Sequence, residues 1–277
     1  MAYTLFYSPD SANLVVRMAL EEIGVAYEAL EVDRRQGAQR SPAFLKFNPQ
    51  GLLPVLADPA QDEPLFETAA ILLHLADQHA ALKPLHPSAR GRFLKWLFFL
   101  SNTVHADLRM LFYTERYAAA AASVAALRAH LHPRVLAHLS LLEAELARHG
   151  GLWLLGGELS VCYLYLAVCV RWLQLYPRGD TVGAHHLKVF PRLLTLLQAL
   201  SQREAVRRAF AAEGIDGALF VSPEYPRNAV VSPPGTSITR LPVHLLMPCL
   251  ANQGRQYGHE TEKHPRSRAQ ARPPNPA

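Results

Sequence analysis

The order of elements predicted for the first 32 residues restricts the fold of this chain more than any other feature. Residues 3–7 are aromatic and β-branched and stop at a Ser-Pro-Asp sequence at residues 8–10, which predicts a strand followed by a loop. Residues 12–24 place apolar side chains on one helical face and reach Gly24, a typical helix stop. Residues 26–32 then alternate apolar and charged side chains, as a strand does. A strand, a helix and a strand with short links form a βαβ unit, so we expect a parallel strand pair with a right-handed crossover.

The rest of the first eighty residues predicts two more short strands and another helix. The strands are expected at residues 53–57 and 63–66, and the segment between them suits an antiparallel hairpin. A strongly apolar segment at residues 67–79 predicts a helix. With a short helical turn near residues 43–47, the order of elements over residues 1–80 is β-α-β-α-β-β-α.

After residue 80 the sequence favours helices only. Residues 81–87 contain two prolines and no periodicity, so we interpret them as a linker between two domains. Helix patterns are predicted at residues 88–118, 124–149, 160–176, 188–201 and 203–212. We therefore expect an all-helical second domain over residues 88–215.

The last part of the sequence has a different composition. Ten of the 21 prolines lie in residues 216–277, together with glycine, serine and scattered charge. Such a segment buries too little apolar surface to offset the entropy of ordering it. We therefore predict a disordered tail over residues 216–277.

Composition and charge argue against several classes of protein. Half of the residues are hydrophobic and 18% are charged, which is typical of a globular protein. The net charge of +5 comes largely from residues 216–277, so it gives little support for nucleic-acid binding. The longest apolar stretch, residues 159–170, is too short to cross a bilayer and stops at Arg171. The N-terminal residues also lack the pattern of a signal peptide. We expect neither a nucleic acid nor a membrane as a partner.

The cysteines and histidines predict neither a disulfide framework nor a metal site. The chain has three cysteines, an odd and sparse set that fits a reducing cytoplasm. Cys162 and Cys169 lie two helical turns apart on one face, where we expect small buried side chains. The histidines lack a third ligand at a suitable spacing, so we predict no metal.

The most informative motif lies around Pro54. The sequence Leu-Leu-Pro-Val-Leu at residues 52–56 opens a predicted strand, although a proline cannot donate to a strand ladder. It is preceded by Asn-Pro-Gln-Gly at residues 48–51 and followed by Phe-Glu-Thr-Ala-Ala-Ile at residues 66–71. This set resembles the glutathione site of the cytosolic glutathione transferases. The resemblance covers residues 3–215 and implies a thioredoxin-like first domain and an all-helical second domain.

The resemblance implies glutathione contacts for five residues. In the family the proline is cis and the residue before it offers its backbone to the cysteinyl part of glutathione, which implies Pro54 and Leu53 here. Glu67 and Thr68 open a helix, where free amides and the helix dipole favour an anion. Thr68 is expected to hold the γ-glutamyl carboxylate and Glu67 the ammonium group, and the alternative is that both only cap the helix. Arg35 is the candidate partner of the glycine carboxylate, and the alternative is that it is a solvated loop residue.

Three residues are candidates for the sulfur end of glutathione. Ser11 occupies the position of the catalytic hydroxyl in the serine-type members, and the alternative is a plain cap for the helix at residues 12–24. Tyr7 and His105 match the bacterial beta class, which has a tyrosine near the sulfur and a histidine from the first helix of the second domain. Ala12 stands where that class has its cysteine, so chemistry through a protein thiol is not expected at this site.

We therefore predict a glutathione transferase of the beta- or theta-like bacterial type. With glutathione as co-substrate, it would conjugate the thiolate to small hydrophobic electrophiles bound against Phe112 and Tyr113. By family resemblance we expect a cytoplasmic homodimer that acts in detoxification. Three alternatives remain: a glutathione-dependent isomerase or dehalogenase, a non-catalytic binding or stress-response protein, and a redox enzyme that uses its own cysteine. Ala12 favours the non-catalytic protein, as does Tyr163, which replaces the aspartate of the family's Ser-x-x-Asp cap beginning at Ser160.

Overall fold

The βαβ unit predicted at the start of the chain is present in the computed structural model, which describes residues 2–148, 155, 157–179 and 184–227. Its elements are β1 (Tyr3–Tyr7), α1 (Asn13–Ile23) and β2 (Tyr27–Glu31). The two strands pair in parallel, with Tyr3 opposite Tyr27 and Tyr7 opposite Glu31. The predicted parallel pair is therefore confirmed, with α1 as the crossover.

Two short antiparallel strands complete the sheet. β3 (Val55–Ala57) pairs with β1, and β4 (Leu65–Phe66) pairs with β3, so the strand order is β2-β1-β3-β4. The predicted hairpin is thus confirmed. Its strands are shorter than expected, because Pro54 cannot join a ladder and residues 61–63 form bends before β4.

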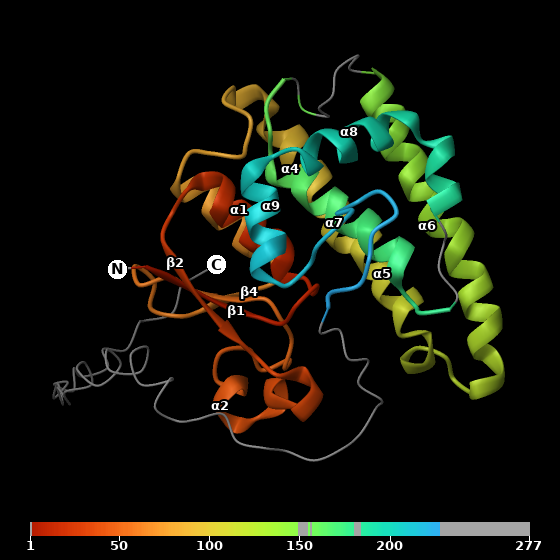
Figure 1. Cartoon of the computed structure of the whole chain (residues 1–277), viewed down its shortest axis with the longest axis horizontal. Helices are drawn as coiled ribbons and strands as arrows, with labels where there is room; N and C mark the ends of the chain where they lie inside the picture. The colour runs from red at the N-terminus through yellow and green to blue at the C-terminus, as the bar shows by residue number, and fades with distance from the viewer. Residues whose placement is uncertain (1, 149–154, 156, 180–183, 228–277) are drawn as a thin grey trace, which may run out of the picture. The chain divides into compact units, whose positions relative to one another are not determined.

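Helices lie on both faces of this sheet (Figure 1). On one face Leu5 belongs to the apolar core formed with α1 and α3 (Thr68–Gln78). On the other face the ring of Phe6 packs 6.1 Å from that of Phe44 in α2 (Pro42–Leu45). The alternation of β1 side chains between two apolar layers gives the layered core of a thioredoxin-like domain.

The described residues after β4 contain helices and turns. The α-helices that follow α3 are α4 (Arg90–Phe99), α5 (His105–Phe112), α6 (Val124–Arg148), α7 (Val161–Leu175), α8 (Pro191–Ser201) and α9 (Glu204–Ala212). The shorter 3-10 segments are η1 (Arg34–Gln36), η2 (Ala38–Arg40), η3 (Pro87–Ala89), η5 (Thr114–Arg116), η6 (Ala121–Ser123) and η7 (Ala184–Val189). In the described part of the chain, no helix is long and apolar enough to cross a membrane.

The helix predicted at residues 88–118 is present over residues 90–112, which is shorter than expected. It contains a π-helical turn, Leu100–Val104, between α4 and α5. The second helix then ends at Phe112, because the Thr114 hydroxyl donates to the Leu111 carbonyl at 2.7 Å and competes with the helix ladder.

α7 is buried along its whole length and packs against both α1 and the other helices. Ser160 stands at its N-cap but its side chain forms no capping bond. The Val161 amide instead donates to the Leu82 carbonyl at 2.9 Å. The Tyr163 hydroxyl accepts a hydrogen bond from the Leu155 amide at 2.7 Å. Loss of the family's capping box is therefore offset by contacts from neighbouring loops.

Residues 216–227 pack on α7, although we assigned them to a disordered tail. Phe220 is fully buried. The Gln174 side chain donates to the Phe220 carbonyl at 2.8 Å and accepts from the Ser222 amide at 3.2 Å. The predicted tail therefore does not begin at residue 216, and residues 228–277 lie outside the described residues. The sequence pattern did not predict this segment, because it is held by contacts with α7 and has no helix or strand periodicity of its own.

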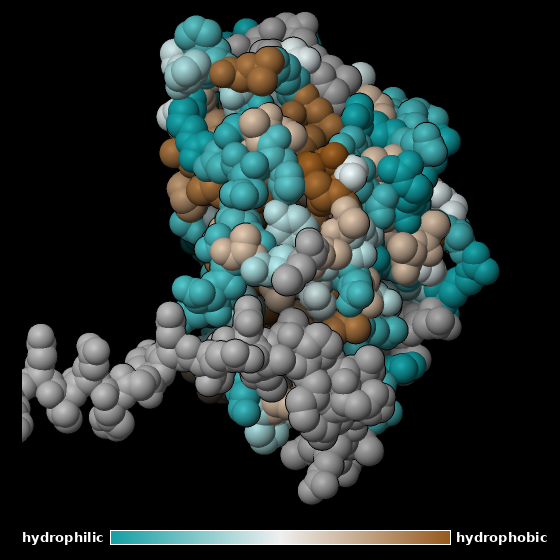
Figure 2. All heavy atoms as spheres, turned by 90° about the vertical axis from the view of Figure 1, so that its left-hand side faces the viewer, coloured by the Kyte–Doolittle hydropathy of each residue, from teal (hydrophilic) through white to brown (hydrophobic). Residues whose placement is uncertain are grey.

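Most of the surface in Figure 2 is hydrophilic, with hydrophobic side chains gathered in the upper half of that face. Over the described residues, the exposed large hydrophobic side chains are Leu45, Leu85, Phe98, Tyr117, Leu141 and Val189. They come from different elements of the fold.

Candidate functional site

Three segments that carry predicted site residues meet at one edge of the sheet. Val55 at the start of β3 lies opposite Phe6 of β1 and opposite Phe66 of β4. Both pairings are antiparallel, so the segment before β3 runs beside the loop after β1 and beside the start of α3. The sheet therefore brings these three segments together.

The Leu53–Pro54 peptide bond is cis, as the resemblance implied. Pro54 is buried and Leu53 is partly exposed. Because β3 begins at Val55, the Leu53 backbone lies outside the ladder of the sheet. Gly51 precedes this segment with φ 64°, and a Cβ there would lie 2.9 Å from the Gln39 carbonyl oxygen. Only glycine fits this position, which brings the turn close to the neighbouring backbone.

The start of α3 has an exposed carboxylate and no side-chain cap. Glu67 stands at the N-cap with φ 71°, a left-handed conformation that is costly without glycine and is found mainly at functional sites. Its exposed carboxylate accepts a hydrogen bond from Gln50 Nε2 at 3.2 Å. Within the described chain no side chain caps α3, so its first amides lack a side-chain partner. The interpretation of Glu67 and Thr68 as plain capping residues is therefore wrong.

Tyr165 of α7 lies near both His105 and Thr68. The His105 Nδ1 atom lies 2.7 Å from the Tyr165 hydroxyl. Burial raises the pKa of Tyr165 well above its ordinary value, and a hydrogen bond with the Thr68 side chain acts in the opposite direction. Tyr165 therefore stays protonated at neutral pH.

His105 is a neutral imidazole at neutral pH. Burial lowers its pKa to about 4, and the nearby Arg109 charge contributes to the same shift. The His105 ring also packs 5.2 Å from the ring of Trp172. A neutral imidazole can donate a hydrogen bond to a sulfur but cannot supply a positive charge beside it.

The shift of His105 predicts that the free energy of unfolding decreases as the pH is lowered from 6.5 to 4. The unfolded imidazole binds a proton below its ordinary pKa of 6.5, whereas the folded one does so only near 4. The full effect is on the order of 3 kcal/mol at about 1.4 kcal/mol per pKa unit. Urea unfolding of the wild-type chain and of His105→Gln across this range measures it. Equal slopes for the two proteins would contradict the assignment.

Ser11 makes a side-chain contact that differs from helix capping. Its hydroxyl donates to Asn13 Oδ1, which also accepts the Ser8 amide at 3.0 Å. The N-cap of α1 is Ala12, and among the described residues no side chain caps this helix. The interpretation of Ser11 as a plain N-cap is therefore wrong.

Tyr7 lies at the end of β1 under the guanidinium of Arg17, whose Cζ is 4.3 Å from the ring centroid. Burial raises the pKa of Tyr7, and Glu31 adds to the rise, so its hydroxyl keeps its proton. Arg17 Nε also pairs with Glu213 at 3.0 Å. Burial raises the pKa of Glu213 to about 7, although the Arg17 charge opposes this. Tyr7 thus lies beside the cluster that holds the loop after β1.

Arg35 is not joined to the other predicted residues by a described contact. It lies in η1, which follows β2. Its Nε donates to Asp33 Oδ1 at 3.0 Å, and this exposed pair raises the pKa of Arg35. Its neighbour Arg34 donates to the Tyr113 hydroxyl at 3.4 Å. A ligand carboxylate would have to compete with Asp33 for Arg35.

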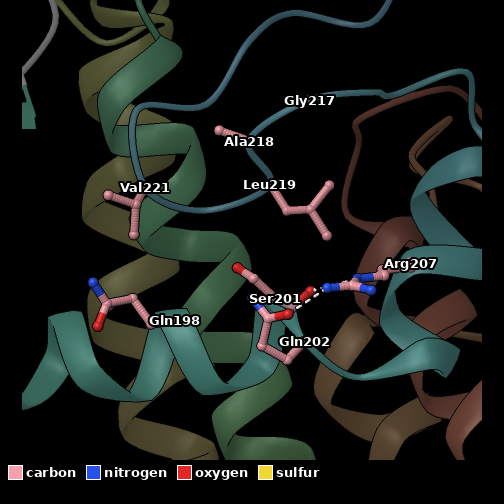
Figure 3. A pocket seen from close by; sticks show the side chains of 8 residues that line it. All are labelled: Gln198, Ser201, Gln202, Arg207, Gly217, Ala218, Leu219 and Val221. Carbon is pink, nitrogen blue, oxygen red and sulfur yellow. Dashed lines mark hydrogen bonds between the residues drawn. The ribbon is translucent and has the colours of Figure 1, made fainter.

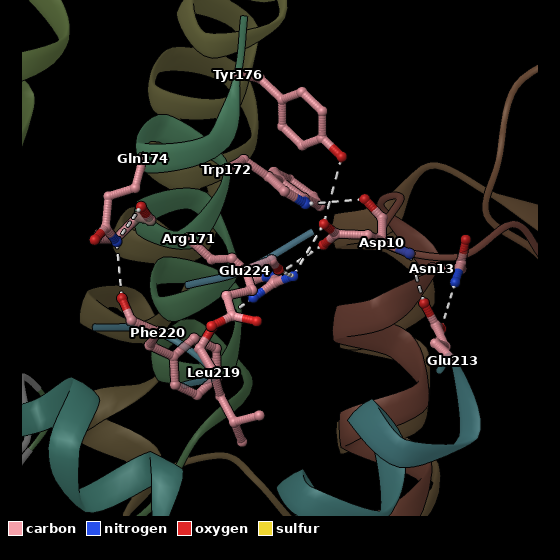
Figure 4. Close-up of polar contacts among 11 residues, drawn as sticks. Asp10, Asn13, Arg171, Trp172, Gln174, Tyr176, Glu213, Leu219, Phe220 and Glu224 are labelled. Atoms are coloured by element: carbon pink, nitrogen blue, oxygen red, sulfur yellow. Dashed lines mark hydrogen bonds and ion pairs between the residues drawn. The ribbon is translucent and has the colours of Figure 1, made fainter. Parts of the chain in front are cut away.

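A buried ion pair beside Ser11 was missed by the sequence analysis. Arg171 Nε and Nη2 contact the two carboxylate oxygens of Asp10 at 2.9 and 3.1 Å, and both side chains are almost fully buried (Figure 4). Burial raises the pKa of Asp10, and Arg171 opposes this rise. The signal was a single charged residue at the end of a wholly apolar helical stretch, which requires a partner.

A separate hollow of about 460 Å³ lies away from this edge (Figure 3). It is lined by Gln198, Ser201, Gln202, Arg207, Gly217, Ala218, Leu219 and Val221. The Arg207 Nε atom donates to the Ser201 carbonyl at 2.9 Å. None of the predicted site residues lines this hollow.

The cysteines described by the structure are unreactive. Cys162 and Cys169 are free and buried, and burial raises the pKa of both thiols, that of Cys162 to about 12. Cys249 lies outside the described residues. Over the described ranges, no group of three or more His, Cys, Asp or Glu residues could hold a metal ion.

Comparison with known proteins agrees with this geometry. Residues 1–77 match the glutathione S-transferase N-terminal domain. The chain is 30% identical over 209 residues to glutathione S-transferase GstB of Escherichia coli K12, covering 74% of this chain and 96% of GstB. It is 37% identical over 101 residues to a maleylacetoacetate isomerase of Rhizobium meliloti, covering 36% of this chain and 46% of the isomerase.

A solved structure supports the same relationship. The crystal structure of a glutathione transferase homologue from Sulfitobacter, with bound glutathione, superposes with a TM-score of 0.66 at 26% sequence identity. The match covers 76% of this chain and 98% of the Sulfitobacter chain. The predicted fold, a thioredoxin-like domain followed by a helical one, is therefore confirmed, and this chain belongs to the glutathione S-transferase family.

Proposed function

We propose that this protein is a glutathione transferase that conjugates glutathione to small hydrophobic electrophiles. The observation that carries the proposal is the sheet edge where the Leu53 backbone lies beside the uncapped start of α3 and the exposed Glu67 carboxylate. A strand-like edge, free helix amides and a carboxylate are complementary to the cysteinyl amide, the α-carboxylate and the ammonium group of one glutathione molecule.

Each end of glutathione has a proposed partner. The Leu53 backbone pairs with the cysteinyl part, and Pro54 shapes that segment. The Thr68 amide and hydroxyl hold the γ-glutamyl carboxylate while Glu67 binds the ammonium group. Arg35 is the candidate for the glycine carboxylate, in competition with Asp33.

The sulfur would be stabilised as a thiolate by neutral donors. A free thiol has a pKa near 8.5, so hydrogen bonds to the charged form are needed to ionise it at neutral pH. The Ser11 hydroxyl is the main donor in this proposal, with Tyr7 and His105 as further donors. The thiolate attacks an electrophilic carbon, a carbon–sulfur bond forms, and the leaving group departs with its electron pair.

The electrophile is proposed to bind against the end of α5. The ring of Phe112 lies 5.7 Å from that of Tyr176, and Tyr113 contacts Arg34 from the first domain. Aromatic side chains at such a junction favour flat apolar molecules. We also infer, by analogy with the family, a cytoplasmic homodimer with a role in detoxification.

A glutathione-dependent isomerase is the second candidate. The match to the Rhizobium meliloti maleylacetoacetate isomerase favours it. The glutathione half of the site would be the same in both enzymes, and only the electrophile differs. Incubation with maleylacetoacetate and with aryl halides distinguishes the two, since an isomerase returns glutathione unchanged.

The proposal is tested by the ultraviolet absorbance of thiolate when glutathione binds, measured as a function of pH. We expect a thiol pKa near neutrality for wild type and a rise of about 1–2 units in Ser11→Ala, since hydrogen bonds to charged groups contribute about 1.5–3 kcal/mol. The conjugation rate at pH 6.5 should fall by about 10- to 100-fold. Binding without ionisation would indicate a non-catalytic protein, and absence of binding would refute the proposed function.

A further inference from the structure

Asp10 lies directly before Ser11, and its amide, carbonyl and carboxylate all form hydrogen bonds with the helical part of the chain. Besides the ion pair with Arg171, the Asp10 amide donates to Glu213 Oε2 at 2.8 Å. The Asp10 carbonyl accepts from Trp172 Nε1 at 3.2 Å (Figure 4). Asp10 has φ 55°, a left-handed conformation that is unfavourable without glycine. These contacts offset that cost, so the helical domain determines the shape of the turn.

Asn13 determines the direction of the Ser11 side chain. Its Oδ1 atom accepts from the Ser11 hydroxyl and the Ser8 amide, and its Nδ2 atom donates to Glu213 Oε1 at 2.7 Å. A reversed Asn13 amide would place NH₂ against the Ser8 N–H and an oxygen against the Glu213 carboxylate. Glu213 therefore fixes which atom Asn13 presents to Ser11.

We propose that Arg171, Glu213 and Asn13 are positioning residues that hold the turn at residues 10–13 so that the Ser11 hydroxyl faces the sulfur of bound glutathione. The inference rests on the proposed role of Ser11. In the free chain the Ser11 hydroxyl donates to Asn13 Oδ1, and rotation about the Cβ–Oγ bond redirects the O–H toward a thiolate without moving the oxygen. The new bond is charge-assisted and therefore stronger than the bond to a neutral amide.

Glu213→Gln disturbs this arrangement with minimal change in volume. In its ionised form Glu213 accepts three donors: the Asp10 amide, Asn13 Nδ2 and Arg17 Nε. Glutamine has one oxygen, so its NH₂ group must face either the Asp10 amide or the Asn13 and Arg17 donors. Either arrangement places donor against donor and displaces the turn.

The experiment compares the thiol pKa of bound glutathione in wild type, Ser11→Ala, Glu213→Gln and Ser11→Ala/Glu213→Gln. We expect Glu213→Gln to raise the thiol pKa by at least about half a unit, a threefold loss of thiolate at fixed pH. The double variant should match Ser11→Ala alone, since the positioning residues act through Ser11. Glutathione affinity at low pH, where the thiol is protonated, should stay within about twofold of wild type because the Glu67 end is untouched.

Two further variants complete the test. Glu204→Gln is the matched control, since its side chain is 88% exposed on α9. Trp172→Phe keeps an aromatic ring but removes the donor to the Asp10 carbonyl, and we expect a smaller rise in the thiol pKa. It serves as the second test if Glu213→Gln does not fold. The positioning role alone would be overturned by one result. In that result Ser11→Ala raises the thiol pKa, but Glu213→Gln and Trp172→Phe give the same thiol pKa as Glu204→Gln. No effect of Ser11→Ala would overturn the proposed role of Ser11 as well.

Discussion

Arg171→Met is expected to decrease the free energy of unfolding by about 3–5 kcal/mol, the typical cost of removing one partner from a buried ion pair. The substitution leaves the Asp10 carboxylate without its counter-charge in a fully buried position. It also removes the donors to the carbonyls of Leu219 and Glu224, at 2.8 and 2.7 Å. Urea unfolding at neutral pH and equal protein concentration measures the loss.

A second arginine-to-methionine change, at an exposed ion pair, shows how much of the loss in stability depends on burial of the pair. Arg203 pairs with Glu22 at 2.5 Å, but its side chain is 41% exposed. Because exposed ion pairs contribute at most about 1 kcal/mol, Arg203→Met should have a small effect. A similar loss of stability for Arg203→Met and Arg171→Met would show that the pair between Asp10 and Arg171 has no special structural role.

Phe220→Ala is expected to cost about 3–5 kcal/mol, the usual range for removing a buried phenylalanine side chain. The ring is fully buried and lies 5.1 Å from the ring of Phe210 on α9. The result tests whether residues 216–227 belong to the cooperative core of the helical domain. Thermal and urea unfolding both report the loss.

The control for this prediction is Phe98→Ala on α4, because the Phe98 side chain is 46% exposed. A surface position loses much less burial, so we expect an effect of about 1 kcal/mol or less. If Phe220→Ala proves as mild as Phe98→Ala, residues 216–227 do not contribute to the core. The effect of Ser11→Ala on the thiol pKa of bound glutathione could then still be measured in Phe220→Ala, since it is independent of the change in the free energy of unfolding.

Local patterns were sufficient to predict most elements and the segments that meet at the edge of the sheet. Alternation over residues 26–32 and the helical face of residues 12–24 predicted the βαβ unit because both periodicities follow from backbone geometry. The sequence around Pro54 and the acidic and hydroxyl residues at the start of α3 are contiguous, so short motifs reveal them. Irregularities within helices were harder to predict. The π-helical turn before His105 changes the pattern of backbone hydrogen bonds, but it contains no glycine or proline that would indicate it.

Contacts between distant segments could not be predicted from these patterns. Asp10 meets Arg171 and Glu213, which lie 161 and 203 residues further along the chain, and Thr68 meets Tyr165. A buried charge requires a partner of opposite charge, but its position in the sequence does not identify that partner.

By itself, therefore, the sequence determined the order of the elements, the family and the segments that meet at the edge of the sheet, because these depend on local periodicity and contiguous motifs. The tertiary structure alone decided the surroundings of Ser11: the hydroxyl contacts Asn13, and Glu213 holds Asn13 from the end of the helical domain. It also decided that residues 216–227 are packed, since Phe220 is buried only because α7 and α9 lie beside it. The physical reason is the same in both cases: hydrogen bonds and burial depend on which groups meet in space, and local propensity does not specify that.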